Sequence, residues 1–313
     1  MPRPPRDEET ILHIARLHHE EGLMQTEIAR DLKISEATVS RYLRQAMELG
    51  FIEVRVASRA FRNFDLERRL VRRFGLVSAI VIEPRTSAAE TRRILGNAAG
   101  RALEDLLANG SVIGVSNGET VAAVAAEARR SRSAHIDVVT LIGGVGRAEE
   151  ATHTGQICRT LADRLGGRSW ILPVPAVVDS PALAETLRGM EAFREVFSLF
   201  DRMTVAVIGV GALTPESSTF QHGLFTQGHL RGIVARHAAG SICARFYDAD
   251  GKGLPTDLDA CTLSITLEQL ATVPHRFAVA LGADKVPAIR AGIAGRLINM
   301  LGTDAPTAEA LLG

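Results

Sequence analysis

Apolar residues recur at helical spacing in three stretches of the first fifty residues, with polar breaks between them. Residues 9–20 carry apolar positions three and four apart, which places them on one side of a helix. A shorter stretch contains Ile28, Ala29 and Leu32 and ends at Lys33. Ser35 then offers a hydroxyl that can accept a hydrogen bond from a free backbone N–H, which predicts a new helix start. The sequence therefore predicts three helices, the last two joined by a tight turn.

The helix expected after Ser35 has two different faces. Val39, Leu43 and Ala46 fall together on an apolar face. The other face is small at its N-terminal end and continues with polar residues and arginines, which fits the major groove of DNA. We predict DNA contacts from this helix and its cap by Ser35, Ala37, Thr38, Ser40, Arg41 and Arg44.

The alternative is an ordinary amphipathic helix pair inside a larger domain, and the next residues argue against it. Residues 51–56 alternate with a period of two, which predicts a strand. Helix, helix-turn-helix and strand follow each other in a winged helix-turn-helix. We assign residues 1–57 to this DNA-binding domain and residues 58–75 to a charged linker helix.

From residue 76 onward, strand-like and helix-like segments alternate. Strands are expected at 77–82, 111–116, 136–144, 169–177, 204–212 and 276–282. Helices are expected at 87–108, from the loop 117–120 to about 130, at 154–165 and at 284–297. This order predicts a mostly parallel sheet with helices on both faces, a Rossmann-like α/β domain over residues 76–313.

Composition limits the classes that remain. The chain has 313 residues, enough for one small and one large domain, and its hydrophobic fraction of 46% supports a sizeable core. The first 60 residues hold nine Arg/Lys and ten Asp/Glu, a net charge of −1. DNA affinity must therefore come from local placement and from dimerisation. A run of arginines between residues 59 and 73 fits phosphate contacts and a solvated linker helix equally well.

Cysteine usage and the N-terminus indicate an intracellular protein. Cys158, Cys243 and Cys261 are far apart, so neither a disulfide framework nor a zinc site is expected. Residues 1–9 lack the apolar core of a signal peptide, and no apolar run is long enough to span a bilayer. We expect a cytoplasmic protein without a membrane partner.

Loops at the ends of the expected strands are the candidate ligand site, because open α/β sheets bind ligands there. The segment GVSNGET at 114–120 turns from strand to helix, and its N–H and hydroxyl groups can hold an anion. A plain tight turn is an equally good reading of this loop alone. Gly-Gly-Val-Gly-Arg at 143–147 and Gly-Val-Gly at 209–211 follow two further strands.

Nucleotide cofactors are disfavoured at these loops. No Gly-Lys-Ser/Thr follows residue 114, and no complete GxGxxG with a distant acidic residue occurs, so we predict neither ATP nor NAD and no cofactor. Lys285 lies in the first turn of the expected helix at 284–297, which opposes the helix dipole. A bound anion would resolve that conflict, whereas an exposed lysine is the commoner explanation.

Eight segments together resemble the SorC/DeoR type of sugar-binding bacterial transcriptional regulators over residues 10–313. They are QTEIARDLKISEATVSRYLRQAMELGFIEVRV, GVSNGET, LIGGVG, PAVVDS, AVIGVG, GSICARFYDADG, GADKVPAI and LGTDAPTAEALL. The resemblance implies an effector domain similar to sugar-phosphate isomerases, a sugar or phosphosugar effector, operator DNA, and a homodimer or homotetramer. It also implies that no residue is catalytic.

The resemblance also implies which residues hold the effector. Loop 116–120 would face its phosphate or carbonyl end, Lys285 would hold a phosphate, and the region of Gly143 would line the sugar. The complete candidate set is Ser116, Asn117, Gly118, Glu119, Thr120, Gly143, Gly144, His153, Gln221, Asp250 and Lys285.

Three positions depart from the family pattern. Met24 stands where a capping Thr is common, and Lys33 stands where a turn Gly is usual, so Lys33 is expected in a left-handed conformation. Ser241 occupies a position that is often acidic and bonds sugar hydroxyls, which leaves Asp248, Asp250 and Gln221 as candidates for that role.

We therefore expect a ligand-responsive regulator of a carbohydrate-catabolism operon. An isomerase-like enzyme fused to a DNA-binding domain is the alternative, but it needs a general base, and Glu119 is the sole acid in the Gly loops. A nucleotide-sensing redox regulator is a third class, disfavoured by the missing dinucleotide fingerprint.

Overall fold

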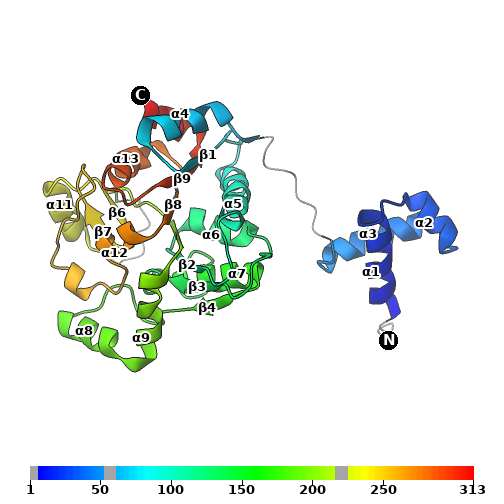
Figure 1. Cartoon of the computed structure of the whole chain (residues 1–313), viewed down its shortest axis with the longest axis horizontal. Helices are drawn as coiled ribbons and strands as arrows, with labels where there is room; N and C mark the ends of the chain where they lie inside the picture. The colour runs from blue at the N-terminus through cyan, green and yellow to red at the C-terminus, as the bar shows by residue number, and fades with distance from the viewer. Residues whose placement is uncertain (1–5, 53–60, 216–224) are drawn as a thin grey trace. The chain divides into compact units, whose positions relative to one another are not determined.

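A computed structural model describes residues 6–52, 61–215 and 225–313, and the chain divides into two compact units, Met1–Ala57 and Ser58–Gly313. The first unit contains α1 (Arg6–His19), α2 (Gln25–Asp31) and α3 (Glu36–Glu48) (Figure 1). Ile14, Ile28, Val39 and Leu43 are buried together at its centre, so the predicted apolar faces form its core. The strand expected at 51–56 lies mostly outside the described residues.

Seven strands of the second unit form one parallel sheet in the order β1-β9-β8-β5-β2-β3-β4. The bounds are β1 (Ser78–Ile82), β2 (Val112–Val115), β3 (Asp137–Thr140), β4 (Arg168–Trp170), β5 (Val205–Ile208), β8 (His275–Val279) and β9 (Met300–Asp304). The strands are apolar on both sides because helices cover both faces. In β1, Ala79 and Val81 face one core cluster, and Ile80 and Ile82 face the other.

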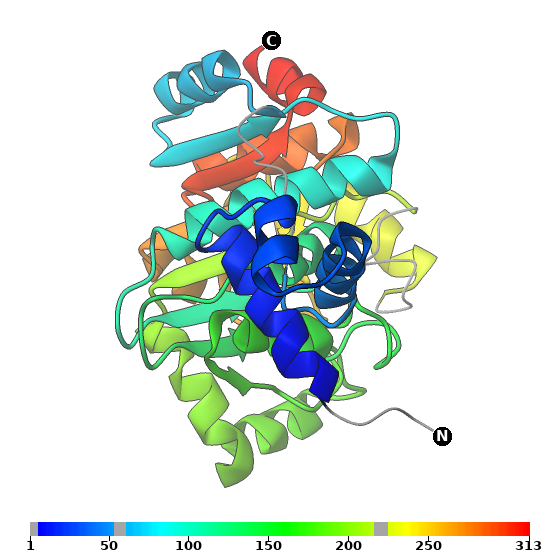
Figure 2. The same ribbon diagram turned by 90° about the vertical axis from the view of Figure 1, so that its right-hand side faces the viewer.

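Three helices cover one face of the sheet: α5 (Ala88–Glu104), α6 (Glu119–Glu127) and α7 (Thr154–Leu165) (Figure 1). The opposite core cluster is covered by α4 (Phe64–Phe74), α9 (Glu191–Ser198), α12 (Leu267–Thr272), α13 (Val286–Ala294) and α14 (Ala305–Leu312). Figure 2 shows β1 beside β9, with α4 and α14 next to them. The predicted doubly covered parallel sheet is thus confirmed.

The remaining elements are short. They are α8 (Pro181–Gly189), α11 (Gln227–Ala235), β6 (Gly240–Ile242), β7 (Arg245–Tyr247), and the single turns η2 (Phe200–Arg202), η3 (Asp259–Cys261) and η4 (Ala283–Lys285). The strands β6 and β7 form a separate antiparallel pair. Within the described ranges, no helix is long and apolar enough to cross a membrane.

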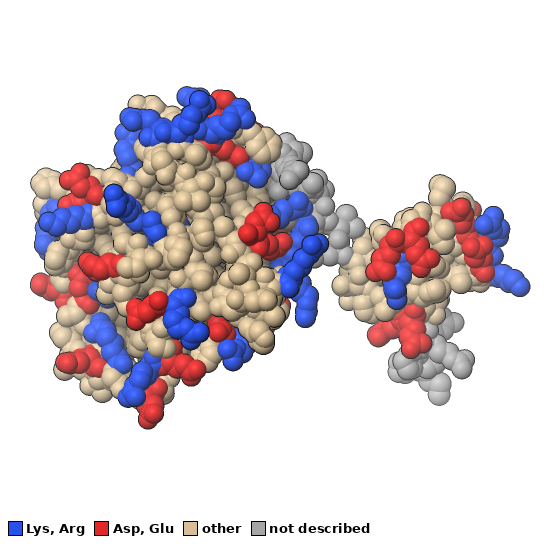
Figure 3. All heavy atoms as spheres, viewed as in Figure 1, with Lys and Arg blue, Asp and Glu red and all other residues tan. Residues whose placement is uncertain are grey.

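The helix expected between residues 58 and 75 is shorter and is packed into the second unit. Helix α4 begins at Phe64 and buries Leu66 and Leu70 beside β1 and α14. Its exposed side carries Arg68, Arg69, Arg72 and Arg73, which form a basic cluster over α4 in Figure 3. An aspartate within α4, Asp65, lies within 4.0 Å of two of these arginines and compensates part of their charge.

Four expected strands end clearly earlier than predicted. The segment 136–144 is a strand only to Thr140, 169–177 only to Trp170, 204–212 only to Ile208 and 276–282 only to Val279. Pro173 and Pro175 lack an N–H and cannot continue a ladder, so the chain makes only isolated bridges there, such as Gly144 with Pro175.

Because the second unit has its own core, a chain that begins at Ser58 should fold without the first unit. We expect circular dichroism and a cooperative thermal transition typical of an α/β domain, since the core clusters of this unit include none of the described residues before Phe61. An aggregated or unfolded product would show that the first unit is needed for folding.

Candidate functional site

The helix α3 is built as the sequence predicts. The Ser35 hydroxyl caps it by accepting a hydrogen bond from the Thr38 N–H at 3.1 Å, and the two hydroxyls lie 2.8 Å apart. Val39, Leu43 and Ala46 are buried, which fixes the helix to its own unit. Thr38 is half-buried and its hydroxyl already contacts Ser35, so it belongs to the cap more than to the outer face.

The outer face of α3 is free to meet another surface. Ala37, Ser40, Arg41 and Arg44 are all exposed, as is Ser35 at the helix start. The guanidinium of Arg41 lies 5.5 Å from the centre of the Tyr42 ring. The side of the helix that carries the arginines is thus opposite the buried side, as a major-groove reader requires.

The two ends of α2 show how Lys33 and Met24, which depart from the family pattern, are accommodated. Lys33 has φ 53°, the left-handed conformation expected for a position where glycine is usual. Met24 is 65% exposed at the start of α2, and the Glu27 carboxylate accepts a hydrogen bond from the Met24 N–H at 2.7 Å. Glu27 thereby satisfies one N-terminal donor of a helix that lacks a capping hydroxyl.

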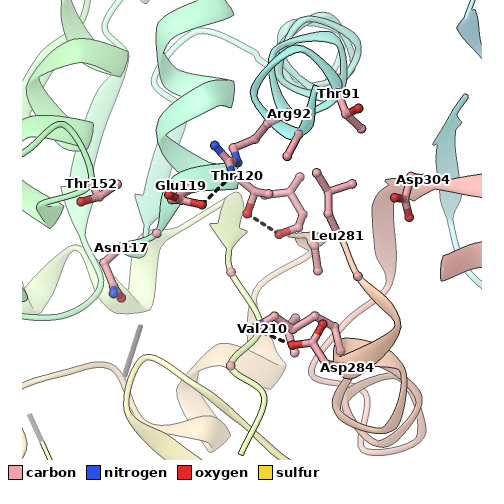
Figure 4. Close-up of a pocket in the computed structure, with 18 of the residues that line it drawn as sticks. Thr91, Arg92, Asn117, Glu119, Thr120, Thr152, Val210, Leu281, Asp284 and Asp304 are labelled. Carbon is pink, nitrogen blue, oxygen red and sulfur yellow. Dashed lines mark hydrogen bonds and ion pairs between the residues drawn. The ribbon is translucent and has the colours of Figure 1, made fainter. Parts of the chain in front are cut away.

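A cavity of about 700 Å³ opens in the second unit at the carboxyl ends of β1, β2, β5, β8 and β9 (Figure 4). It lies where the strand order reverses. From β2 the chain continues to its neighbour β3 on one side, whereas from β5, on the other side of β2, it continues in the opposite direction to β8. Open α/β sheets bind ligands at such a switch point. The cavity is large enough for a sugar-sized molecule.

The loop after β2 supplies one wall of this cavity with Asn117, Gly118, Glu119 and Thr120. Gly118 has φ 116°, a conformation that favours glycine, and it precedes the first residue of α6. The Thr120 hydroxyl donates to the Val279 carbonyl at 2.8 Å, which joins this loop to the end of β8. That hydroxyl therefore holds the wall in place.

Ser116 lies beneath the cavity and does not line it. It is 1% exposed, and its hydroxyl accepts from the Gly209 N–H at 2.8 Å and donates to the Asn117 carbonyl at 3.2 Å. Its contribution is to fasten the loop after β2 to the loop after β5.

Charged side chains in the cavity are paired with neighbours. Arg92 of α5 lies 2.7 Å from Glu119, and both point toward the cavity in Figure 4. Lys285 lies 3.8 Å from Asp284 at the opposite wall, and burial lowers its pKa despite the opposing effect of Asp284. Lys285 ends the single turn η4 just before α13, so it stands at a helix N-terminus as predicted.

Comparison with known proteins shows which family the chain belongs to. The Sugar-bind family, which describes a sugar-binding domain, matches residues 58–313. The chain belongs to this family. The sorbitol operon regulator of Klebsiella pneumoniae is 31% identical over 305 residues, which cover 96% of this chain and 97% of the relative. The deoxyribonucleoside regulator of Bacillus subtilis is 27% identical, with 96% of each chain covered.

One solved structure agrees over nearly the whole length. The crystal structure of the full-length sorbitol operon regulator SorC from Klebsiella pneumoniae matches with a TM-score of 0.79 at 30% identity, and covers 99% of this chain and 100% of that one. The protein is therefore a SorC/DeoR-type sugar-binding transcriptional regulator with a helix-turn-helix unit.

Several residues proposed as effector contacts from the SorC/DeoR resemblance lie elsewhere. Gly143 and Gly144 pack against the backbone around Pro175, and His153 caps α7 by accepting from the Gly155 N–H at 3.2 Å. These three are outside the cavity lining, although the same loop after β3 contributes Thr152 to it. Asp250 is exposed in the turn after β7, outside the cavity lining. Gln221 falls outside the described residues.

The cavity also contains residues that the sequence did not single out. Some of them could have been found from the sequence, because Pro84 and Arg85 follow a strand and Asp304 ends one. Ser241 lines the cavity, as its place in the SorC/DeoR pattern implies, and the adjoining turn adds Cys243 and Ala244. Burial raises the pKa of Cys243 to about 12, so its thiol stays protonated and is a poor nucleophile.

Proposed function

We propose that this regulator binds a sugar or sugar phosphate in the cavity at the switch point, and that binding changes the affinity of α3 for operator DNA. The observation that carries this proposal is the combination, in one chain, of an outward-facing α3 and a polar cavity at the carboxyl ends of the sheet. Asn117, Ser241 and the charged pairs offer donors and acceptors for hydroxyl groups. As a DNA-binding protein of a bacterial regulator family, it would work in the cytoplasm as a homodimer or homotetramer.

Lys285 is our candidate for the phosphate end of the effector. It is half-buried at the N-terminus of α13, and the N-terminus of α6 lines the same cavity. Both helix ends favour negative charge. Lys285 and the loop 117–120 would then bind one anionic group from two sides.

Replacing Lys285 by alanine should weaken a phosphorylated effector by about 1.5–3 kcal/mol, the usual scale for a charged hydrogen bond. Sorbitol and sorbitol 6-phosphate are the first probe pair, within a thermal-shift screen of sugars, polyols and their phosphates. Calorimetry on Lys285→Ala should show the loss for the phosphate only. Lys252→Ala is the matched control, since Lys252 is exposed and lies outside the cavity. Equal losses for both probe forms would exclude Lys285 as a phosphate ligand.

The affinity for a phosphorylated effector should also fall as the pH rises. Burial lowers the pKa of Lys285, so its positive charge is lost at a lower pH than that of an exposed lysine. Calorimetry between pH 7 and 10 should show a decline for sorbitol 6-phosphate that sorbitol and Lys285→Ala do not share. A flat profile for the wild type would mean that Lys285 does not hold the phosphate.

We assign no catalytic reaction to the cavity. Among the described residues, three acids line it and each is engaged: Glu119 pairs with Arg92, Asp284 pairs with Lys285, and Asp304 accepts a hydrogen bond from the Thr307 N–H at 3.2 Å. An isomerase needs a carboxylate that can abstract a proton. A coupled assay of the purified protein with pentose and hexose phosphates tests this assignment, and turnover would contradict it.

A further inference from the structure

The chain enters the second unit along the strand whose end forms one wall of the cavity. The Phe61 carbonyl accepts from the Glu83 N–H at 2.7 Å, and the Asn63 N–H donates to the Val81 carbonyl at 2.8 Å. These bonds flank an isolated antiparallel bridge to β1. Residues 61–63, the first described residues of the second unit, are therefore fixed to residues 81–83, directly before the cavity residues that follow β1; we call residues 61–63 the connecting segment.

Arg85, two residues after Glu83, contacts both the cavity and Phe61 of the connecting segment. Arg85 lines the cavity, and its guanidinium lies 5.1 Å from the centre of the Phe61 ring. Its backbone is held, because the Arg85 N–H donates to the Thr91 hydroxyl at 2.8 Å. Its side chain is held loosely: it lies 3.6 Å from Glu90 and is 44% exposed.

We propose that Arg85 couples the effector cavity to the connecting segment: it turns from the Phe61 ring toward the oxygen atoms of a bound effector. This rests on the proposed function, since it assigns the regulation of the same cavity. A ligand shifts a two-state equilibrium only by binding one state better. An effector that binds the guanidinium of Arg85 prefers the state in which this side chain faces the cavity. In that state the cation–π contact between Arg85 and the Phe61 ring is broken.

The contacts of Arg62 and Glu67 are tighter than those of Arg85, so the side chain of Arg85 is the part of this region that can move. Arg62 and Glu67 form two hydrogen bonds of 2.7 Å, and Glu67 also accepts from the Val81 N–H at 3.0 Å. Glu67 is buried, so this anchor of the connecting segment is rigid. Phe61, next to this anchor, is then the point at which the cavity acts on the connecting segment.

The test uses the full chain without any ligand, on an operator duplex selected from random-sequence DNA by the wild type. Phe61→Leu keeps the apolar contact and removes the aromatic face, and Arg85→Gln removes the cation. Each should change operator affinity at least fivefold, both in the same direction, and the double variant should change it no further. Phe64→Leu is the matched control: Phe64 also lies near an arginine, Arg62 at 5.0 Å, but it lies outside the cavity lining.

The outcomes separate this inference from the proposed function. Wild-type operator affinity in Phe61→Leu or Arg85→Gln, additive effects in the double variant, or an equal change in Phe64→Leu would overturn the coupling. Thermal unfolding midpoints within two degrees of the wild type, measured on every variant, show that folding is not the cause. Calorimetry of Phe61→Leu with sorbitol 6-phosphate and sorbitol measures effector binding separately from operator binding. If the wild type selects no duplex and binds no sugar in the screen, the proposed function itself is wrong.

Discussion

Replacing Arg41 and Arg44 together by alanine should abolish most operator binding while leaving the fold intact. Each arginine that contacts a base edge or phosphate contributes about 1–3 kcal/mol, so the pair should cost about 2–6 kcal/mol. Both side chains are exposed, and the core of the unit is made by the opposite side of α3. The free energy of unfolding should therefore change little.

The salt dependence of binding identifies what the two arginines contact. Each phosphate contact that is lost lowers the slope of log K against log salt by about 0.9. A slope reduced by about two points to phosphates, whereas lost discrimination between operator and random DNA points to bases. Arg16→Ala is the control, because Arg16 is exposed on α1 and pairs with Glu20 at 3.0 Å. If the double variant binds like the wild type across a salt series, α3 is not the reading helix.

The helix-turn-helix could be predicted because its signals are local. The cap at Ser35, the left-handed turn at Lys33 and the two faces of α3 depend on residues within one or two helical turns. The structure confirms all three. Local signals were also enough to locate the strands with continuous apolar runs, such as β1 and β5.

The cavity could be predicted only in part, because its composition depends on the order of strands in the sheet. The sequence shows that the loop at 117–120 follows a strand, but not that β2 lies beside β5 and far from β4. Gly143 and Gly144 follow a strand as well, yet they lie outside the cavity lining, to which the loop after β3 contributes Thr152. Arg92 was missed because it lies inside a helix and reaches the cavity through the packing of α5 on α6.

Arg245 illustrates a contribution that no local pattern indicates. The two residues before it, Cys243 and Ala244, line the cavity with φ of 50° and 62°, which is unfavourable for residues with a side chain. Arg245 is buried, and its guanidinium donates to the Ser264 hydroxyl at 3.0 Å, to Asp259 at 2.8 Å and to the Thr262 carbonyl at 3.0 Å. These bonds hold the turn between β6 and β7 in its strained shape.

Arg245→Met should therefore destabilise the second unit by about 1.5–3 kcal/mol, because it removes the charged hydrogen bonds to Asp259, Ser264 and Thr262. Thermal unfolding of the full chain should show the loss as a lower midpoint for the larger unit. Arg231→Met is the matched control, since Arg231 is exposed on α11 and its loss should stay within about 0.5 kcal/mol.

The same substitution should weaken effector binding even below the unfolding temperature. Without Arg245, the turn at Cys243 and Ala244 can relax from its positive φ values, and Ser241 next to it loses its fixed place in the cavity wall. Arg245→Lys keeps the charge but lacks the planar guanidinium whose three nitrogens reach three separate partners, so it should fall between the wild type and Arg245→Met in both measurements. A variant Arg245→Met that melts with the wild type and binds the same probe would show that the turn is held by packing alone.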